Sequence, residues 1–154
     1  MRKALHNLLL NYPEDVVLLH PDMWPFDTPQ ALNSGIQEPN IVNLACGLAS
    51  TGKSVIVYAV AGFVLYKAYE QIKYNVKGWA EFSGSITFVN AGHNGCYSAC
   101  GRGHEVQDDW QLCSALGLEL YEPKDVEEFV QSMKEFIPMK GSRFVRLGFD
   151  TEPR

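Results

Sequence analysis

Three features are missing from this sequence, and each absence excludes a class of protein. Acidic residues outnumber basic ones, 18 to 13, and no basic cluster occurs, which argues against a nucleic-acid binder. The longest apolar stretch, residues 55–66, is too short and too interrupted to cross a bilayer, and the first residues lack a full apolar signal segment. We therefore expect no membrane span and no nucleic-acid partner.

Cysteine is also scarce. The four cysteines lie in a chain of 154 residues, which is long enough to build a core without disulfides. We interpret them as reduced thiols and predict a cytoplasmic protein. The length, a hydrophobic share of 46% and the absence of internal repeats fit one globular domain over residues 1–154.

Strands and helices are predicted to alternate along the chain. The runs VVLL at 16–19, SVIVYAV at 54–60 and SITFVN at 85–90 lack polar alternation, which is typical of strands covered on both faces. Residues 21–35 contain three prolines and are expected to form a loop, and Asp125 is expected to cap a late helix. The predicted fold is α/β, with three layers (α/β/α) and a mainly parallel central sheet. Such sheets bind ligands beyond the carboxyl ends of their strands.

A nucleotide site is one interpretation of the sequence. GLASTGKS at residues 47–54 fits the G-x-x-x-x-G-K-S phosphate-loop pattern. A phosphate loop must follow a strand and open a helix, so that backbone amides and the helix dipole face the phosphates. Here a helix is predicted before the motif and a strand after it. This order favours a helix C-terminus that turns through Gly52 into a strand.

A metal site is a second interpretation. His93, Cys96, Cys100 and His104 place four metal-capable side chains within twelve residues, and zinc takes four such ligands. Their spacing departs from the usual arrangement of two close pairs separated by a longer span. Free cysteines account for Cys96 and Cys100 as well, so the metal assignment stays open.

A longer set of landmarks runs from residue 35 to the end of the chain. It comprises GIQEPN at 35–40 before an apolar helix, YAVAGF at 58–63 with AYEQI at 68–72, AG at 91–92 with GH at 103–104, and FVRLG at 144–148. In this order they resemble the pyrimidine-binding domain of the transketolase and deoxyxylulose phosphate synthase family of thiamine diphosphate enzymes. Four landmarks in one order are more specific than either short motif.

The resemblance implies one half of a cofactor site. Glu38 matches the family's carboxyl group that hydrogen-bonds the aminopyrimidine ring of thiamine diphosphate and so activates the cofactor ylid. Phe63 matches an aromatic ring that stacks on the pyrimidine, and Tyr58 is expected to line the same pocket. The expected fold is therefore the thiamine diphosphate-binding fold.

The resemblance also implies residues on the substrate side. His104 is expected to pass protons to or from the oxygen of a small keto substrate, as a second catalytic residue beside Glu38. Lys67 and Asp109 are expected to assist as substrate-binding residues. The family's threonine before the histidine is Gly103 here, and its following glutamine is Glu105, so the substrate class stays open.

The family's other domains have no counterpart in this sequence. Nothing resembles the diphosphate-binding domain, which holds Mg²⁺ with a G-D-G motif and a downstream asparagine, or the carboxy-terminal domain of transketolases. The resemblance therefore implies a separate diphosphate-domain subunit that holds Mg²⁺, arranged with this chain as a heterotetramer. The expected activity is a transketolase-like transfer of a two-carbon ketol or acyl unit, or decarboxylation of a 2-keto acid. The alternative is a non-catalytic pyrimidine-domain protein with a binding or scaffolding role.

Overall fold

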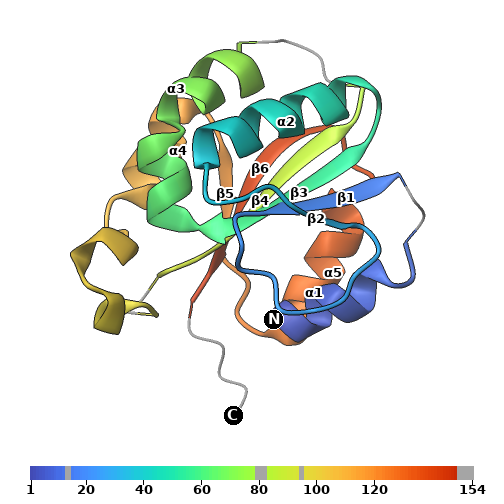
Figure 1. The fold of residues 1–154 in the computed structure, drawn as a ribbon, viewed down its shortest axis with the longest axis horizontal. Coiled ribbons are helices and arrows are strands. Elements are labelled where there is room, and N and C mark those ends of the chain that lie inside the picture. The colour runs from blue at the N-terminus through green and yellow to red at the C-terminus, as the bar shows by residue number, and fades with distance from the viewer. Residues whose placement is uncertain (13–14, 79–82, 94–95, 149–154) are drawn as a thin grey trace.

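A six-stranded sheet forms the centre of the molecule, and every neighbouring pair of strands is parallel (Figure 1). The computed structural model describes residues 1–12, 15–78, 83–93 and 96–148. The strand order is β2-β1-β3-β4-β6-β5. The strands are β1 (Val16–His20), β2 (Ala31–Asn33), β3 (Ser54–Val60), β4 (Ser85–Ala91), β5 (Glu119–Tyr121) and β6 (Gly141–Leu147).

Helices cover both faces of this sheet, so the predicted three-layer α/β/α fold is confirmed (Figure 1). One face packs against α1 (Arg2–Leu9) and α5 (Val126–Phe136). The other packs against α2 (Glu38–Ser50), α4 (Asp109–Leu116) and a segment built from η1 (Phe63–Lys67), α3 (Tyr69–Gln71) and η2 (Ile72–Val76). Two short turns, η3 (Ser98–Cys100) and η4 (Arg102–His104), follow β4.

The central strands explain why their sequences show no polar alternation. All seven residues of β4 are buried, as are six of the seven in β3. Successive side chains of a strand point to opposite faces, so Val57 joins the core under α2 while Tyr58 joins the core under α1 and α5. Both faces of the sheet are therefore apolar, as in other parallel sheets.

The edge strand β2 was not expected from the sequence. It lies in the proline-rich segment for which a loop is predicted, and it pairs with β1 through the register Leu18↔Ala31. It has three residues and is partly exposed, so no hydrophobic period can develop.

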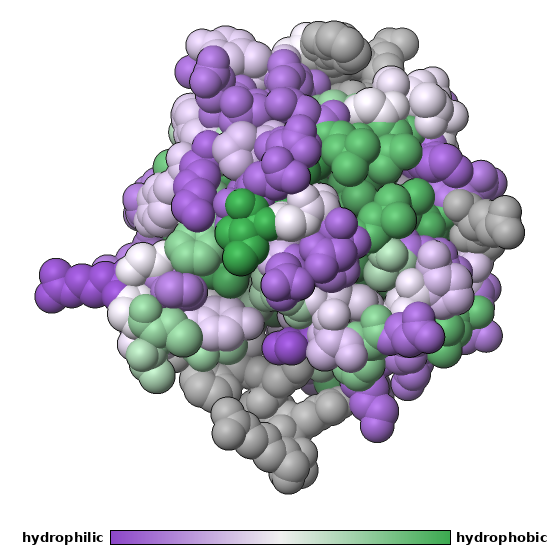
Figure 2. Space-filling view, in the orientation of Figure 1, coloured by the Kyte–Doolittle hydropathy of each residue, from purple (hydrophilic) through white to green (hydrophobic). Residues whose placement is uncertain are grey.

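Figure 2 shows hydrophobic surface beside α2, over the β1–β2 edge of the sheet. A cavity of about 320 Å³ on this edge is lined by Val16, Val17, Pro29, Gln30 and Leu32.

The helical segment after β3 contains two π-helical turns. A helix through residues 66–76 is expected from the sequence, and the chain is helical there, but η1 and η2 are wider than an α-helix and flank one short α-helical turn. A π turn holds one more residue than an α turn and often occurs near functional sites. The hydrophobic pattern predicts a helix, and it does not distinguish these hydrogen-bonding patterns.

Other local expectations are confirmed. Asp125 caps α5, because its Oδ1 accepts a hydrogen bond of 2.8 Å from the Glu128 backbone N–H. The GLASTGKS segment begins inside α2, turns through Gly52 and enters β3 at Ser54. This order is the reverse of a phosphate loop.

No helix among the described residues is long and apolar enough to span a membrane. All four cysteines are free thiols. The cytoplasmic location inferred from them stays a prediction.

The turn before β4 gives a test of how tightly the sheet is packed. A Cβ added at Gly84 would lie 2.0 Å from the backbone oxygen of Lys53, and a backbone atom cannot rotate away as a side chain can. We expect Gly84→Ala to lower the free energy of unfolding by about 1–3 kcal/mol, measured by urea denaturation. The control is Gly47→Ala in the exposed face of α2, where a Cβ meets nothing within 4 Å. That variant should be more stable than the wild type by about 0.5–1 kcal/mol, and equal effects of the two substitutions would contradict the prediction.

Candidate functional site

Three segments meet at the carboxyl edge of the sheet and bring polar side chains together there. The first is the start of α2, which follows β2; the second is η1, which follows β3; the third is the segment with η3 and η4, which follows β4. The carboxyl ends of parallel strands meet at one edge, so their following segments are neighbours in space.

Glu38 is the most buried charged group of the first segment, with 3% of its surface exposed. It is the first residue of α2, and Pro39 follows it. An acidic side chain in the first helical turn is stabilised by the helix dipole, and proline suits this position because no intrahelical N–H is needed. Burial of a carboxylate requires a partner. In the described part of the chain, that partner is Lys67, whose Nζ lies 3.4 Å from Glu38 Oε2.

Phe63 and His104 extend this pair into a cluster. Lys67 Nζ lies 4.1 Å from the centroid of the Phe63 ring, within the range of a cation–π contact. The Phe63 and His104 rings meet edge to face, with their centroids 4.8 Å apart and an interplanar angle of 64°. Four of the residues predicted from the sequence therefore lie together: Glu38, Phe63, Lys67 and His104.

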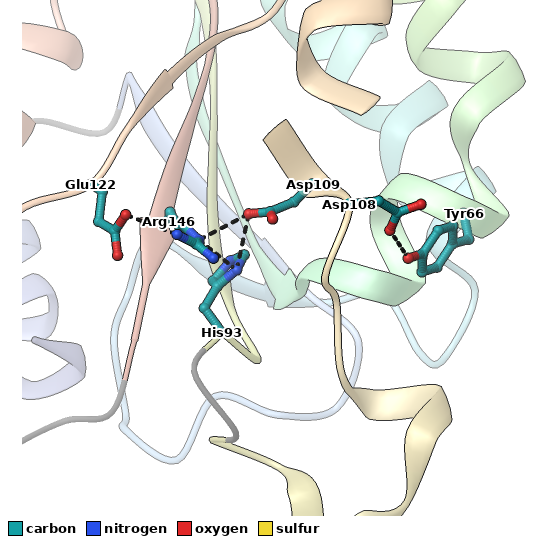
Figure 3. Close-up of polar contacts among 6 residues, drawn as sticks. All are labelled: Tyr66, His93, Asp108, Asp109, Glu122 and Arg146. Atoms are coloured by element: carbon teal, nitrogen blue, oxygen red, sulfur yellow. Dashed lines mark hydrogen bonds and ion pairs between the residues drawn. The ribbon is translucent and has the colours of Figure 1, made fainter. Parts of the chain in front are cut away.

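A polar cavity of about 800 Å³ adjoins this cluster. Its lining includes Tyr66, Arg102 and Glu105, which are chain neighbours of the cluster residues, together with Gln107 and Asp108. Tyr66 donates a hydrogen bond to Asp108 (Figure 3). Burial and this bond to a carboxylate raise the pKa of Tyr66 to about 12, so the phenol keeps its proton. The cavity therefore presents both positive and negative groups.

Tyr58 does not lie with the cluster. Its side chain points to the opposite face of the sheet, where it packs edge to face on Trp24 with the centroids 5.0 Å apart. The Arg2 guanidinium lies 5.9 Å from the same ring. Tyr58 is 1% exposed and belongs to the core between β3 and α1. Alternation along the strand separates it from Phe63, which follows the strand end.

Asp109 lies in a second, buried cluster of charged side chains (Figure 3). It begins α4 and is fully buried, with Oδ2 2.9 Å from Arg146 Nε and 3.0 Å from His93 Nδ1. Arg146 Nε also donates to His93 Nδ1 at 2.9 Å, and Arg146 binds Glu122 through a second nitrogen at 2.9 Å. Asp109 is therefore an internal residue of this Arg146 cluster, which comprises His93, Asp109, Glu122 and Arg146.

The contacts indicate which groups of the Arg146 cluster carry charge. Since His93 Nδ1 accepts the Arg146 N–H, this nitrogen carries no proton of its own. Burial and the adjacent Arg146 guanidinium lower the pKa of His93 to about 3. Burial raises the pKa of Asp109, and Arg146 opposes that shift. At neutral pH His93 is neutral, and Arg146 supplies the positive charge of the cluster, between Asp109 and Glu122.

The Arg146 cluster fixes the segment that carries His104. His93 precedes this segment and Asp109 follows it, and both are bound to the same guanidinium. Gly92 allows close packing at its start, because its φ is 114° and a Cβ there would lie 3.1 Å from the His104 backbone oxygen. The Arg146 cluster thus joins the residues that precede and follow the segment with His104.

Sequence reasoning did not identify the role of Arg146. A charged residue inside the apolar strand FVRLG is the signal that could have identified it, because an arginine in a buried strand needs a partner. The partner could not be predicted, since Asp109 lies on a helix and His93 follows another strand.

The interpretation of His93, Cys96, Cys100 and His104 as metal ligands finds no support in the geometry. His93 is bound to Arg146 and Asp109, whereas His104 packs on Phe63. Across residues 1–12, 15–78, 83–93 and 96–148, no three or more His, Cys, Asp or Glu side chains form a group that could hold a metal ion.

The chain is similar in sequence to a transketolase-related protein. No protein-family model matches the chain. A protein of Methanocaldococcus jannaschii named for a transketolase C-terminal section is 26% identical over 116 residues. The match covers 75% of this chain and 36% of that protein, so the chain spans about a third of the length of this relative.

Solved structures of transketolases share the fold. A split-gene transketolase, solved as an inactive beta4 tetramer, matches 99% of this chain and 53% of its own, with a TM-score of 0.76 and 22% identity. A transketolase mutant from Pichia stipitis has a TM-score of 0.82 and 16% identity, over 99% of this chain and 26% of its own. The transketolase of Campylobacter jejuni has a TM-score of 0.75 and 14% identity, over 96% of this chain and 25% of its own.

Loss of Arg146 should destabilise the protein strongly. Removal of one member of a buried ion cluster leaves the other charges without compensation, which costs about 3–5 kcal/mol. We expect Arg146→Met to lower the free energy of unfolding by about this amount, measured by urea denaturation. Arg102→Met, at an exposed arginine of η4, is the control and should change it by less than about 0.5 kcal/mol. Similar values for the two variants would show that the Arg146 cluster contributes little.

Stability should also depend on pH through His93. Its pKa is about 3 in the folded protein, against the ordinary histidine value of 6.5 that applies to the unfolded chain. Below pH 6.5 the unfolded chain therefore binds a proton that the folded protein does not, and stability falls as pH decreases, by up to about 1.4 kcal/mol per pH unit. We expect the free energy of unfolding to fall less between about pH 6.5 and pH 5 in His93→Gln than in the wild type. Parallel pH profiles would contradict this assignment. The raised pKa of Asp109 gives a slope of opposite sign in both proteins.

Proposed function

We propose that this chain, a pyrimidine-binding domain of the transketolase family, provides one half of a thiamine diphosphate site with Glu38 as its acid–base group. The observation that carries the proposal is the cluster of Glu38, Phe63 and His104 at the carboxyl edge of the parallel sheet. It combines a buried carboxylate, an aromatic face and an imidazole, which are the groups that an aminopyrimidine cofactor and a keto substrate would need.

The Glu38 carboxylate and the Phe63 ring are suited to the pyrimidine end of the cofactor. Lys67 Nζ lies 4.1 Å from the Phe63 ring centroid and 3.4 Å from Glu38 Oε2. A flat ring stacked on Phe63 would lie at a similar height, because carbon atoms in contact are about 3.5–4.0 Å apart. There is therefore a position at which one group contacts both the aromatic face and the carboxylate.

The residues of this chain would then have distinct roles. Bound thiamine diphosphate supplies a nucleophilic carbon that also acts as an electron sink. Glu38 holds a proton at the pyrimidine ring nitrogen, and Phe63 stacks on that ring, which adds about 0.5–1.5 kcal/mol beyond its area burial. Tyr58 supports the strand from the opposite face, so the pyrimidine contacts that we propose come from Glu38 and Phe63.

His104 is proposed as the group that moves a proton at the substrate oxygen. Imidazole accepts and donates protons near neutral pH. Lys67 is proposed to bind the substrate, and Asp109 is proposed to contribute by holding the His104 segment through Arg146. The proposed reaction class is transfer of a two-carbon ketol or acyl unit, or decarboxylation of a 2-keto acid.

The other half of the site is proposed to come from a second subunit. In this proposal Mg²⁺ and the diphosphate are held by a diphosphate-domain partner. The split-gene transketolase with the same fold supports a divided enzyme. We propose a heterotetramer with the cofactor between unlike subunits.

The decisive substitution is Glu38→Gln. We expect the wild-type chain, co-expressed with a diphosphate-domain subunit, to catalyse exchange of the C2 proton of thiamine diphosphate, followed by NMR in deuterium oxide. Loss of the carboxyl group should slow this exchange about 100-fold or more, because a positioned acid–base group contributes about 10²–10⁴. Glu70→Gln, at an exposed glutamate of α3, is the matched control and should exchange at the wild-type rate.

Two results would contradict this function. Exchange by Glu38→Gln at the wild-type rate would exclude Glu38 as the acid–base group. A stable complex of the two wild-type subunits that binds the cofactor without exchange would favour the non-catalytic binding or scaffolding role.

A further inference from the structure

We propose that Lys67 is a displaceable plug of the cofactor site, which fills the pyrimidine position until the cofactor enters. This inference rests on the proposed function and adds a regulatory element to it. Its basis is the geometry of three side chains: the Lys67 ammonium, the Glu38 carboxylate and the Phe63 ring.

The ammonium occupies the position that the pyrimidine would need. Lys67 Nζ contacts Glu38 at 3.4 Å and lies 4.1 Å from the Phe63 centroid, so it is in contact with both surfaces at once. A ring stacked on Phe63 and hydrogen-bonded to Glu38 would overlap this atom, because both would occupy the first contact layer above the aromatic face. Lys67 and the cofactor therefore exclude one another.

The Lys67 ammonium and the aminopyrimidine would interact with Glu38 and Phe63 in similar ways. An ammonium donates hydrogen bonds to a carboxylate and interacts with the face of an aromatic ring through its charge. A protonated or hydrogen-bonding aminopyrimidine offers N–H donors to the carboxylate and its own ring to Phe63. In the cofactor-free chain, Lys67 thus removes the cost of leaving the buried Glu38 carboxylate without a partner.

The displaced side chain also has a place to go. The side chain of Lys67 is 48% exposed, and lysine has a flexible four-carbon stem. The cavity of about 800 Å³ lined by its chain neighbour Tyr66 also contains two carboxylates, Glu105 and Asp108, of which Asp108 accepts a hydrogen bond from Tyr66. We propose that the ammonium moves from Glu38 toward these acidic groups or into solvent when the cofactor enters.

Binding of the pyrimidine half of the cofactor tests the plug without requiring catalysis. The probe is 4-amino-5-hydroxymethyl-2-methylpyrimidine, titrated into the full chain and followed by calorimetry and by NMR of the Phe63 ring. We expect Lys67→Met to bind it about three- to tenfold more tightly than the wild type, because the competing cation is absent. Lys67→Arg keeps a cation and should show no gain.

Two further measurements separate displacement of Lys67 by the pyrimidine from a general effect of lysine substitution on this helical segment. Lys73 lies in the same helical segment, 5.8 Å from the Tyr69 ring centroid, and Lys73→Met should bind like the wild type. In the wild type, bound pyrimidine should speed the labelling of Lys67 by an amine reagent and leave Lys73 unaffected. A lysine with a purely structural role would not respond in this way.

The outcomes distinguish the plug from the proposed function. If Lys67→Met binds the pyrimidine no more tightly than the wild type, while Glu38→Gln abolishes binding, the plug is excluded and the pyrimidine site stands. Slower or unchanged labelling of Lys67 in the complex excludes the plug as well. Absence of binding by the wild type and Lys67→Met, or binding that Glu38→Gln leaves unchanged, removes the pyrimidine site and the plug with it.

Discussion

The parallel direction of all six strands is the constraint on which the candidate site depends. It places the segments after β2, β3 and β4 at one edge, so Glu38, Phe63 and His104 lie in one cluster although the first and the last are 66 positions apart in the sequence. The same direction buries both faces of the central strands and leaves little room there for polar groups. The polar chemistry of the molecule therefore collects at the strand ends. Two clusters occupy them, one partly open to solvent around Glu38 and one closed around Arg146.

The two clusters have different physical tasks. In the Arg146 cluster His93 and Asp109 are buried and Glu122 is partly exposed, and positive and negative groups are combined, so its value is the fixed position of the segment with His104 rather than net stabilisation. The Glu38 cluster holds a long, half-exposed lysine in contact with a buried carboxylate. The Arg146 cluster resists rearrangement, whereas Lys67 in the Glu38 cluster can exchange Glu38 for another partner. A site that must admit a ligand needs both properties, because the reacting groups require a rigid frame and the entrance requires a movable group.

Most of the fold could be predicted from the sequence, because buried parallel strands and amphipathic helices carry strong hydrophobic patterns. Strand β2 could not, since three partly exposed residues carry no period. For the site, the order of motifs led to Glu38, Phe63, Lys67 and His104, which the structure brings together. The contacts of Tyr58 and Asp109 depend on which face of a strand or helix a side chain occupies and on distant partners such as Trp24 and Arg146. The family resemblance could place these residues in sequence, whereas their contacts required the three-dimensional packing.

The π-helical turn of η1 has a consequence for how this domain can change during evolution. Phe63 and Lys67 are its first and last residues, four positions apart, and this spacing places their side chains on one side of the turn. An insertion or deletion between them would change this spacing. A change of length within η1 would therefore alter the contact between Lys67 and the Phe63 ring even if both residue types were retained.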